Sequence, residues 1–174
     1  MIFHRLGLIN KDQRGFSLTE LMLAFLIAGI ITAGITTTIF SVVNGSARTS
    51  NHMTAVRQVQ NAGYCVSRDA QMAQPQKVVA SGALPFTLKW TDWDKNNHEV
   101  VYSLADNKLQ RSHSINGGLA ETGIIAEFIN PDPAMTGCDF TDGKLTFTVT
   151  ATVGAGSRYE QSETRVYEVV PRPE

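Results

Sequence analysis

Cysteine is scarce in this sequence: there are only two, Cys65 and Cys138, among 174 residues. Two cysteines allow at most one internal disulfide, which excludes the small secreted proteins that depend on several disulfides. Charged residues make up only 18%, and the 15 basic and 16 acidic side chains nearly cancel, leaving a net charge of −1. These values exclude a disordered polar chain and give no general electrostatic reason to expect nucleic-acid binding.

A long uncharged run occurs once, at residues 21–43. As a helix this run would reach about 35 Å, enough to cross a hydrocarbon core of about 30 Å. Because no second run resembles it, we expect a single membrane span. The segment before residue 16 carries three basic residues and one acidic residue, namely Arg5, Lys11, Arg14 and Asp12. The positive-inside rule therefore places the N-terminus in the cytoplasm and the C-terminal bulk outside.

Two general interpretations of this run leave something unexplained. A secretory signal would need a small-residue cleavage site, which residues 45–47 could supply, but its apolar stretch is only about 7–15 residues long. A plain signal anchor fits the length but does not explain Glu20 at the edge of the run, unless that carboxylate merely stays hydrated at headgroup level. A carboxylate inside the membrane costs roughly 3 kcal/mol on insertion scales, so Glu20 is a candidate functional residue.

A third interpretation comes from residues 14–21, which read Arg-Gly-Phe-Ser-Leu-Thr-Glu-Leu and lead into the uncharged run. This pattern resembles the prepilin signal of type IV pilins and the related pseudopilins. Gly29 and Ile30 also match a glycine-isoleucine pair that is common in the helix of that family. The motif is specific because a basic leader, Gly-Phe, a glutamate and an apolar run coincide.

The resemblance implies a processing route and a set of partners. A prepilin peptidase would cut between Gly15 and Phe16 on the cytoplasmic face, and Phe16 would become the N-methylated first residue. Glu20 matches the family's glutamate and would pair with the amine of Phe16 in a neighbouring subunit, which offsets the cost of desolvating either charge alone. The implied partners are the peptidase, other pilin or pseudopilin subunits, an inner-membrane assembly platform and membrane lipid. The protein would lie in the inner membrane before assembly and in a filament afterwards.

One feature common in major pilins is missing, a helix-kinking proline about twenty residues after the cut. The corresponding residues 33–38 read Ala-Gly-Ile-Thr-Thr-Thr. Gly29 and Gly34 could loosen the helix locally, and the threonine hydroxyls could bond back to preceding carbonyls. The absence of proline favours a minor pilin or pseudopilin over a major pilin.

Beyond the membrane run, apolar residues continue at helical spacing along one face: Val56, Val59, Gly63, Val66, Ala70 and Ala73. Polar residues, Asp69 among them, are expected on the other faces. Pro75 cannot continue a helix, so we predict one helix over residues 16–74, membrane-spanning in its first half and amphipathic in its second. The apolar stripe must pack on another element.

Residues 76–174 are predicted to form an extracytoplasmic β-rich domain that supplies this element. Alternating apolar residues and turn signals indicate strands near residues 86–91, 99–104, 108–112, 124–129, 145–153 and 163–170. The expected fold class is α+β, with a long N-terminal helix packed on an antiparallel sheet, which is also the pilin fold. The organisation is then a leader (1–15), a long helix (16–74, with 21–43 in the membrane) and the β domain (76–174).

Candidate residues for chemistry are few. Cys65 on the helix and Cys138 in a predicted loop either form a disulfide or remain separate buried thiols, and the sequence leaves both open. Asp92, Asp94 and Asn96 start like a calcium loop, but the glycine and the glutamate that such a loop needs are absent. The histidines His4, His52, His98 and His113 show no paired ligand spacing. We therefore expect no metal and no cofactor.

No catalytic motif or phosphate-binding loop occurs, so we expect a non-enzymatic filament subunit of a type IV pilus, type II secretion or competence system. The alternative is a binding module at a filament tip, either an adhesin or a DNA-capture subunit. Without the leader, acidic residues outnumber basic ones, so DNA capture would need a local basic patch. Trp90, Trp93 and several tyrosines alternate within predicted strands, where packing is the default and an exposed ligand face is the alternative.

Overall fold

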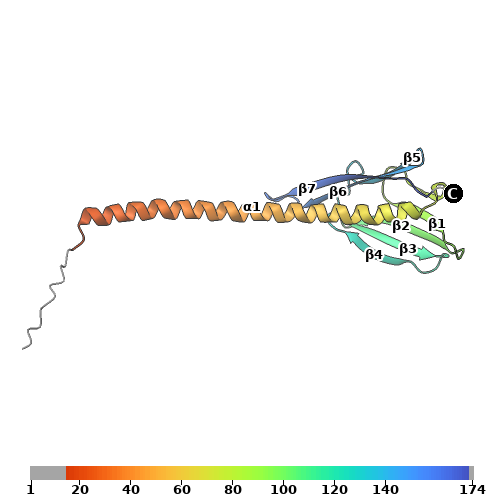
Figure 1. Cartoon of the computed structure of the whole chain (residues 1–174), viewed down its shortest axis with the longest axis horizontal. Helices are drawn as coiled ribbons and strands as arrows, with labels where there is room; N and C mark the ends of the chain where they lie inside the picture. Colours follow the sequence, from red (N-terminus) through yellow and green to blue (C-terminus); the bar gives the residue numbers. More distant parts are fainter. Residues whose placement is uncertain (1–14, 173–174) are drawn as a thin grey trace, which may run out of the picture. The chain divides into compact units, whose positions relative to one another are not determined.

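The computed structural model describes residues 15–172, which fall into two units divided between Val43 and Asn44. The helix α1 (Leu18–Met72) makes up nearly all of the described part of the first unit and continues into the second (Figure 1). The helix is two residues shorter at each end than the range 16–74 expected from the sequence. It ends before Pro75, which opens the short 3-10 helix η1 (Pro75–Lys77), because proline lacks the N–H that a further helical turn requires.

The second unit contains seven antiparallel strands in two sheets. The first sheet has the order β1-β2-β3-β4 and the second the order β5-β6-β7. The strands are β1 (Phe86–Thr91), β2 (Asn97–Ala105), β3 (Lys108–Ile115), β4 (Glu121–Ala126), β5 (Gly137–Thr141), β6 (Lys144–Val153) and β7 (Gln161–Val169). The α+β class with a long helix packed on antiparallel β-structure, pilin-like, is thus confirmed.

Three details of the sequence prediction were wrong. The β-structure forms two sheets rather than one. Cys138 lies in β5 and not in a loop, because this short strand pairs with β6 although it has no run of alternating apolar residues. The fourth strand occupies Glu121–Ala126 instead of residues 124–129, because β4 is held by pairing with β3 while most of its side chains stay exposed.

Hairpin turns fix the strand registers. Asp106 and Asn107, between β2 and β3, both have positive φ, at 51° and 59°. Asp142 and Gly143, between β5 and β6, do the same at 53° and 74°. Positive φ at both central residues is the signature of a type I′ turn, which matches the twist of the strands it joins. The predicted Asp106-Asn107 turn is confirmed.

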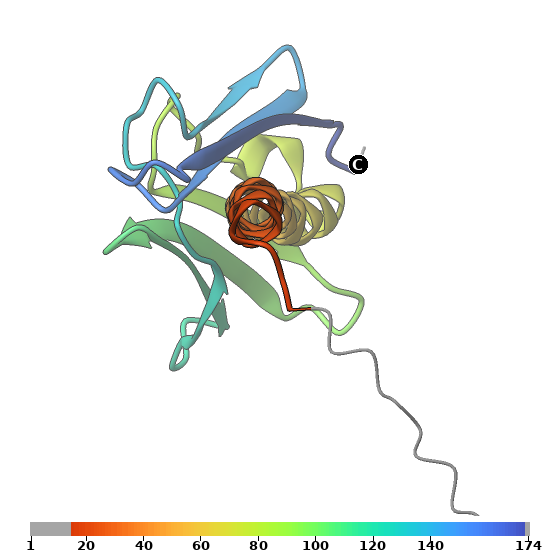
Figure 2. The same cartoon turned by 90° about the vertical axis from the view of Figure 1, so that its left-hand side faces the viewer.

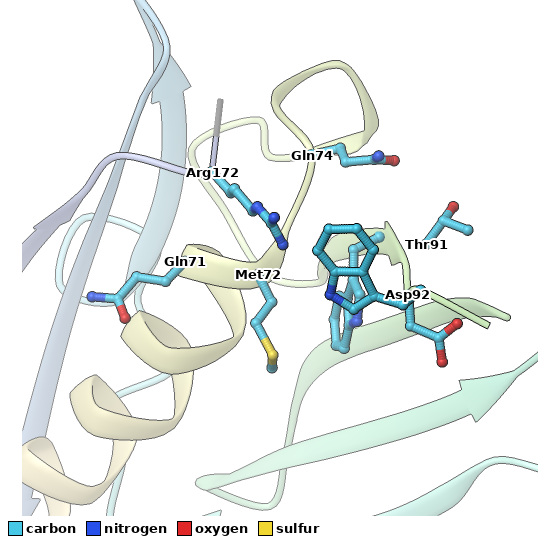
Figure 3. Close-up of a pocket in the computed structure, with 8 residues that line it drawn as sticks. Gln71, Met72, Gln74, Thr91, Asp92 and Arg172 are labelled. Carbon is cyan, nitrogen blue, oxygen red and sulfur yellow. The ribbon is translucent and has the colours of Figure 1, made fainter. Parts of the chain in front are cut away.

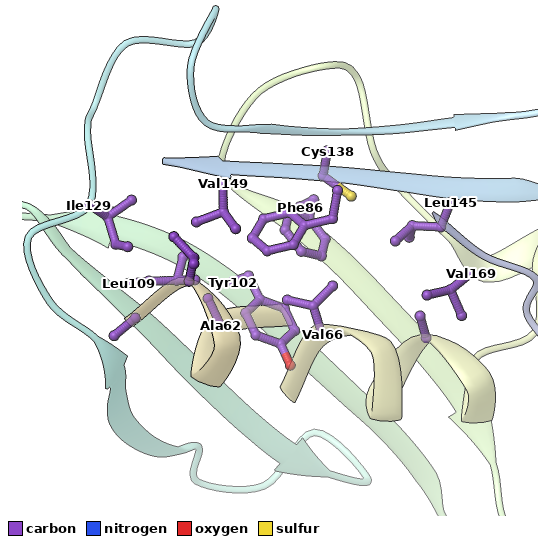
Figure 4. Packing of buried hydrophobic residues seen from close by; sticks show 14 of the residues in the cluster. Ala62, Val66, Phe86, Tyr102, Leu109, Ile129, Cys138, Leu145, Val149 and Val169 are labelled. Carbon is purple, nitrogen blue, oxygen red and sulfur yellow. The ribbon is translucent and has the colours of Figure 1, made fainter. Parts of the chain in front are cut away.

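The core of the second unit lies where both sheets meet one face of residues 44–72 of α1 (Figures 1, 2 and 4). Phe86 from the first sheet contacts Phe147 from the second, with ring centroids 5.8 Å apart. Apart from Asp69, the buried residues of the helix are small residues and valines, namely Ala55, Val59, Ala62, Gly63, Val66 and Ala70, and the buried Ala73 follows directly after it. The predicted stripe is confirmed except for Val56, which is only half-buried, and it also includes Ala55 and Ala62.

Gly63 shows why the helix face must be small. The ring of Tyr167 in β7 lies directly on it, so that a Cβ at position 63 would be 2.0 Å from Tyr167 Cζ. The Tyr167 hydroxyl reaches past the glycine and donates a hydrogen bond to the carbonyl oxygen of Val59, at 3.1 Å. The absence of a side chain at Gly63 thus brings β7 into contact with the helix backbone.

Candidate functional site

The residues assigned to cleavage, methylation and assembly, Gly15, Phe16 and Glu20, stand at the start of α1. All three are exposed, and Phe16 retains 86% of its accessible surface. Gly15 has no atom within 4 Å of the position that a Cβ would occupy, and its φ is ordinary for any residue. Nothing in the described chain therefore requires glycine at this position. The rest of the predicted leader, residues 1–14, lies outside the described residues.

The start of α1 resembles a capping box in its Ser-x-x-Glu spacing and in the contact from the Ser17 N–H to Glu20, whereas the Ser17 hydroxyl bonds to Thr19 Oγ1 and not to the helix backbone. The backbone N–H of Ser17 donates to Glu20 Oε2 over 3.4 Å, and the Ser17 carbonyl oxygen accepts the first helical hydrogen bond from the N–H of Glu20. A glutamate three residues after a helix-capping serine satisfies an N–H that the helix leaves free, and its charge suits the positive end of the helix dipole. Sequence reasoning missed this arrangement, although the Ser-x-x-Glu spacing signals it.

The carboxylate of Glu20 keeps most of its bonding capacity. An ionised carboxylate offers about four lone-pair sites, and the contact from Ser17 is long. The same group can therefore cap its own helix and still accept a donor from outside the chain.

The apolar half of α1 has no cover within the described residues. Every described residue from 15 to 43 is exposed, and the first half-buried residue is Asn44. 

 The helix is long and apolar enough to cross a membrane, with a mean hydropathy of 2.1 in its most apolar window. Length and composition alone also fit other kinds of apolar helix. They indicate that this apolar surface is buried by lipid or by other chains, but they do not distinguish between the two.

The threonines of this half are tied to the helix backbone. The hydroxyls of Thr32, Thr36, Thr37 and Thr38 donate to the carbonyl oxygens four residues earlier, at 2.8–2.9 Å. The predicted back-bonding is thus confirmed, and it hides polar groups that an apolar environment would penalise. α1 remains one uninterrupted helix through this region.

The two cysteines are free thiols in the structure, Cys65 half-buried on α1 and Cys138 buried in β5. Burial raises the pKa of Cys138 to about 12 and also raises the pKa of Cys65 above its ordinary value. Both side chains are therefore held as thiols, which are poor nucleophiles and poor metal ligands. Of the two alternatives left open by the sequence, the structure contains the unbonded one.

The calcium-like residues form the tip of the β1–β2 hairpin. The Asp92 carboxylate accepts hydrogen bonds from the backbone and side-chain N–H groups of Asn96, at 2.8 and 3.0 Å, and lies 3.1 Å from His98 Nε2. The Asn96 side chain and His98 lower the pKa of Asp92 to about 2. Within residues 15–172, no three His, Cys, Asp or Glu side chains come together in a group that could hold a metal ion.

Two histidines that are far apart in the sequence meet on the first sheet. His98 Nδ1 lies 3.0 Å from His113 Nε2, and both rings stack on Trp90, with centroids 5.0 and 5.9 Å away. The β2–β3 register brings them together, since Val100 pairs with His113 and His98 with Ile115. Ligand spacing along the sequence does not reveal this cluster, but counting residues outward from the Asp106-Asn107 turn would have placed the two side chains as diagonal neighbours.

A buried carboxylate joins α1 to the first sheet, and here the prediction of a polar face was wrong. Asp69 is fully buried and accepts hydrogen bonds from the Tyr102 hydroxyl and from Arg111 Nε, both at 2.6 Å. Burial, followed by the charge of Asp69, raises the pKa of Tyr102, so its hydroxyl stays a donor. The spacing of three residues from Val66 placed Asp69 on the apolar face, and this signal was overlooked because the residue is charged.

Comparison with known proteins identifies the N-terminal part of the chain. Residues 10–36 match the prokaryotic N-terminal methylation motif. No curated protein and no solved structure matches the chain. The match includes Gly15, Phe16 and Glu20 and ends within the apolar half of α1. It therefore identifies the N-terminal motif and gives no information about the β domain.

Proposed function

Because the chain carries the N-terminal methylation motif of type IV pilins and pseudopilins, we propose that it is a minor pilin or pseudopilin. In this proposal, the prepilin peptidase cuts between Gly15 and Phe16 and methylates the new amine. The protein is stored in the inner membrane and then assembles with other pilin subunits into a type IV pilus, type II secretion or competence filament. It has a structural role, as pilins do, and catalyses no reaction itself.

The observation that carries the proposal is the exposed apolar half of α1 with a single carboxylate at its start. Large side chains such as Phe16, Phe25 and Ile30 are 66–86% exposed. A surface of this kind is stable in lipid before assembly and among neighbouring helices after it. Glu20 is the one acidic residue in the first turn of α1, so it can mark the position at which a neighbour docks.

Cleavage would create the partner that Glu20 needs. Before the cut, the nitrogen of Phe16 is an uncharged amide; afterwards it is a basic amine at the end of the helix. The amine of a neighbouring subunit would approach the Glu20 carboxylate, whose intrachain contact with Ser17 is long and easily supplemented. Pairing offsets the free-energy cost of desolvating both charges. Because the carboxylate of one subunit pairs with the amine of the next, the pair also sets the register between subunits.

The assignment to a minor rather than a major subunit rests on the helix itself. α1 contains no proline and runs without interruption from Leu18 to Met72, with its threonines bonded back to the preceding turn. Many major pilins resemble one another in having a proline kink in this region. The uninterrupted helix supports a subunit that is used in fewer copies.

The N-terminus of the native protein tests the proposal. Mass spectrometry of the protein isolated from membranes or filaments should find N-methylated Phe16 as the first residue. Gly15→Val should leave the leader attached, because the peptidase meets a branched side chain at the bond it cuts. Gly29→Ala is the matched control, since a Cβ has open space at both positions in the structure. Working filaments that retain residues 1–15, or a terminus near residue 48, would refute the processing step.

A further inference from the structure

A cavity of about 450 Å³ lies in the second unit, where the end of α1 meets the β1–β2 hairpin and the C-terminal segment (Figure 3). Met72 and Arg172 reach it from α1 and from the residues after β7. Its volume falls within the range of about 300–1,000 Å³ that is usual for small-molecule sites. No part of the proposed assembly mechanism uses this cavity.

The aromatic wall of the cavity consists of both tryptophans of the chain, Trp90 and Trp93. Trp90 is nearly buried at 9% exposure, whereas Trp93 is 89% exposed. The Arg172 guanidinium lies 5.6 Å from the centroid of the Trp93 ring, so a flat polar group already rests against this indole. An indole that projects from a hairpin tip beside a cavity can stack on a ligand held there.

One polar side chain that lines the cavity, Gln74, is not fully hydrogen-bonded. The Gln74 Oε1 atom is buried and has no hydrogen-bond partner among residues 15–172. A buried acceptor without a donor is rare in native proteins and calls for a partner. Gln71 and Asp92 add further acceptors, and the Asp92 carboxylate stays ionised above pH 4 because its pKa is about 2.

These groups select one class of ligand. A wholly apolar ligand would leave Gln74 and Arg172 unpaired, an anion would face Asp92, and a cation would face Arg172. A pyranose sugar has one face of C–H groups that can stack on an indole, and hydroxyls around its rim that donate and accept. We propose that this cavity is a binding site for a neutral saccharide, stacked on Trp93 and hydrogen-bonded by Gln74 and Arg172.

The two tryptophans make a direct test possible, because both line this cavity and the tryptophan fluorescence of the protein therefore comes from it alone. The full-length protein is held in lauryldimethylamine oxide, a detergent without a sugar headgroup, and titrated with methyl glycosides of glucose, galactose, mannose and N-acetylglucosamine and with their disaccharides. We expect a saturable change in fluorescence with at least one of them at concentrations up to about 10 mM. Trp93→Ala should weaken binding roughly tenfold, and Trp93→Phe should preserve most of it.

Matched variants separate binding from folding. Tyr64→Ala removes another exposed aromatic residue, 67% exposed on α1 and outside the cavity, and should leave the titration unchanged. Because Trp93 is exposed, its replacement should not alter the thermal unfolding of the domain. The proposal is overturned if no sugar in the panel gives a saturable change, if Trp93→Ala binds like the native protein, or if only spermidine or inorganic phosphate binds. None of these outcomes depends on cleavage or filament assembly.

Discussion

The two halves of α1 share the same helical backbone conformation and differ in whether other parts of the chain pack on them. From residue 44 onwards, one face is buried under two sheets and is built from alanine, glycine and valine. Before residue 44, the described residues are all exposed and are dominated by leucine, isoleucine and phenylalanine. Small residues allow a fixed partner to approach the backbone, whereas large ones fill whatever surface lipid or other helices present. The second half of α1 is thus part of the folded second unit, and the first half is the part that the proposed function assigns to assembly.

The largest effect that the comparison predicts is on assembly, at Glu20. Glu20→Gln removes the charge but keeps a side-chain oxygen that can accept the hydrogen bond from the Ser17 N–H. We expect filaments to be lost while membrane insertion and methylation of Phe16 persist, because only the pairing with a neighbour's amine needs the charge. Electron microscopy of filaments, with mass spectrometry of the membrane fraction, measures both outcomes.

Ser17→Ala is the matched control for this variant. It removes a hydroxyl that bonds only to Thr19 Oγ1, and it leaves the Glu20 carboxylate and its contact with the backbone N–H of residue 17 in place. Filaments should therefore still form. If Ser17→Ala abolished assembly and Glu20→Gln did not, Glu20 would act as a helix cap and not as an intersubunit partner.

The next largest effect is on the folding of the second unit, at Asp69. Asp69→Ala leaves the Arg111 guanidinium and the Tyr102 hydroxyl without their acceptor next to the core. Removing one member of a buried ion pair costs about 3–5 kcal/mol. The free energy of unfolding measured in urea should therefore fall by that amount. Tyr102→Phe removes only one hydrogen bond and should cost about 1 kcal/mol. Asp94→Ala, at an exposed position, should have no effect, and an equal loss there would contradict the assignment.

A pair of glycines sharpens the comparison further. Gly63→Ala places a methyl group inside the Tyr167 ring, so β7 must shift, and overpacking of this kind costs about 1–3 kcal/mol. Gly34→Ala meets nothing within 4 Å in the chain and should leave the unfolding of the second unit unchanged. A filament defect in Gly34→Ala without any loss of stability would show that this glycine contacts a neighbouring subunit.

The sequence predicts the main elements because their physical causes are local. The uncharged run, the stripe from Val59 to Ala73 and the alternation in β6 follow from helix and strand periodicity. The Asp106-Asn107 turn follows from residue types that tolerate positive φ. β5 escaped prediction because its pairing with β6 comes from tertiary contacts and leaves no apolar pattern in its own five residues.

The candidate sites divide in the same way. Gly15, Phe16 and Glu20 are recognised from a short contiguous motif, so no three-dimensional information is needed to find them. The Asp69–Tyr102–Arg111 cluster and the cavity beside Trp93 combine residues separated by more than thirty positions, from α1, β2, β3 and the C-terminal segment. Such groups become visible only when strand register and helix packing are known.

The smallest predicted effect is a pH dependence confined to the second unit. Burial, together with the nearby Arg111 and His98, lowers the pKa of His113 in the folded protein. The unfolded chain therefore binds a proton more readily, so stability is fully present above about pH 6.5 and falls as the pH drops from there through the lower pKa of the folded state. His113→Asn should remove this part of the decline in melting temperature between pH 7 and pH 5. His52→Asn, at an exposed position on α1, should retain the full decline, and identical profiles for the two variants would show that the imidazole pair has no part in the pH response.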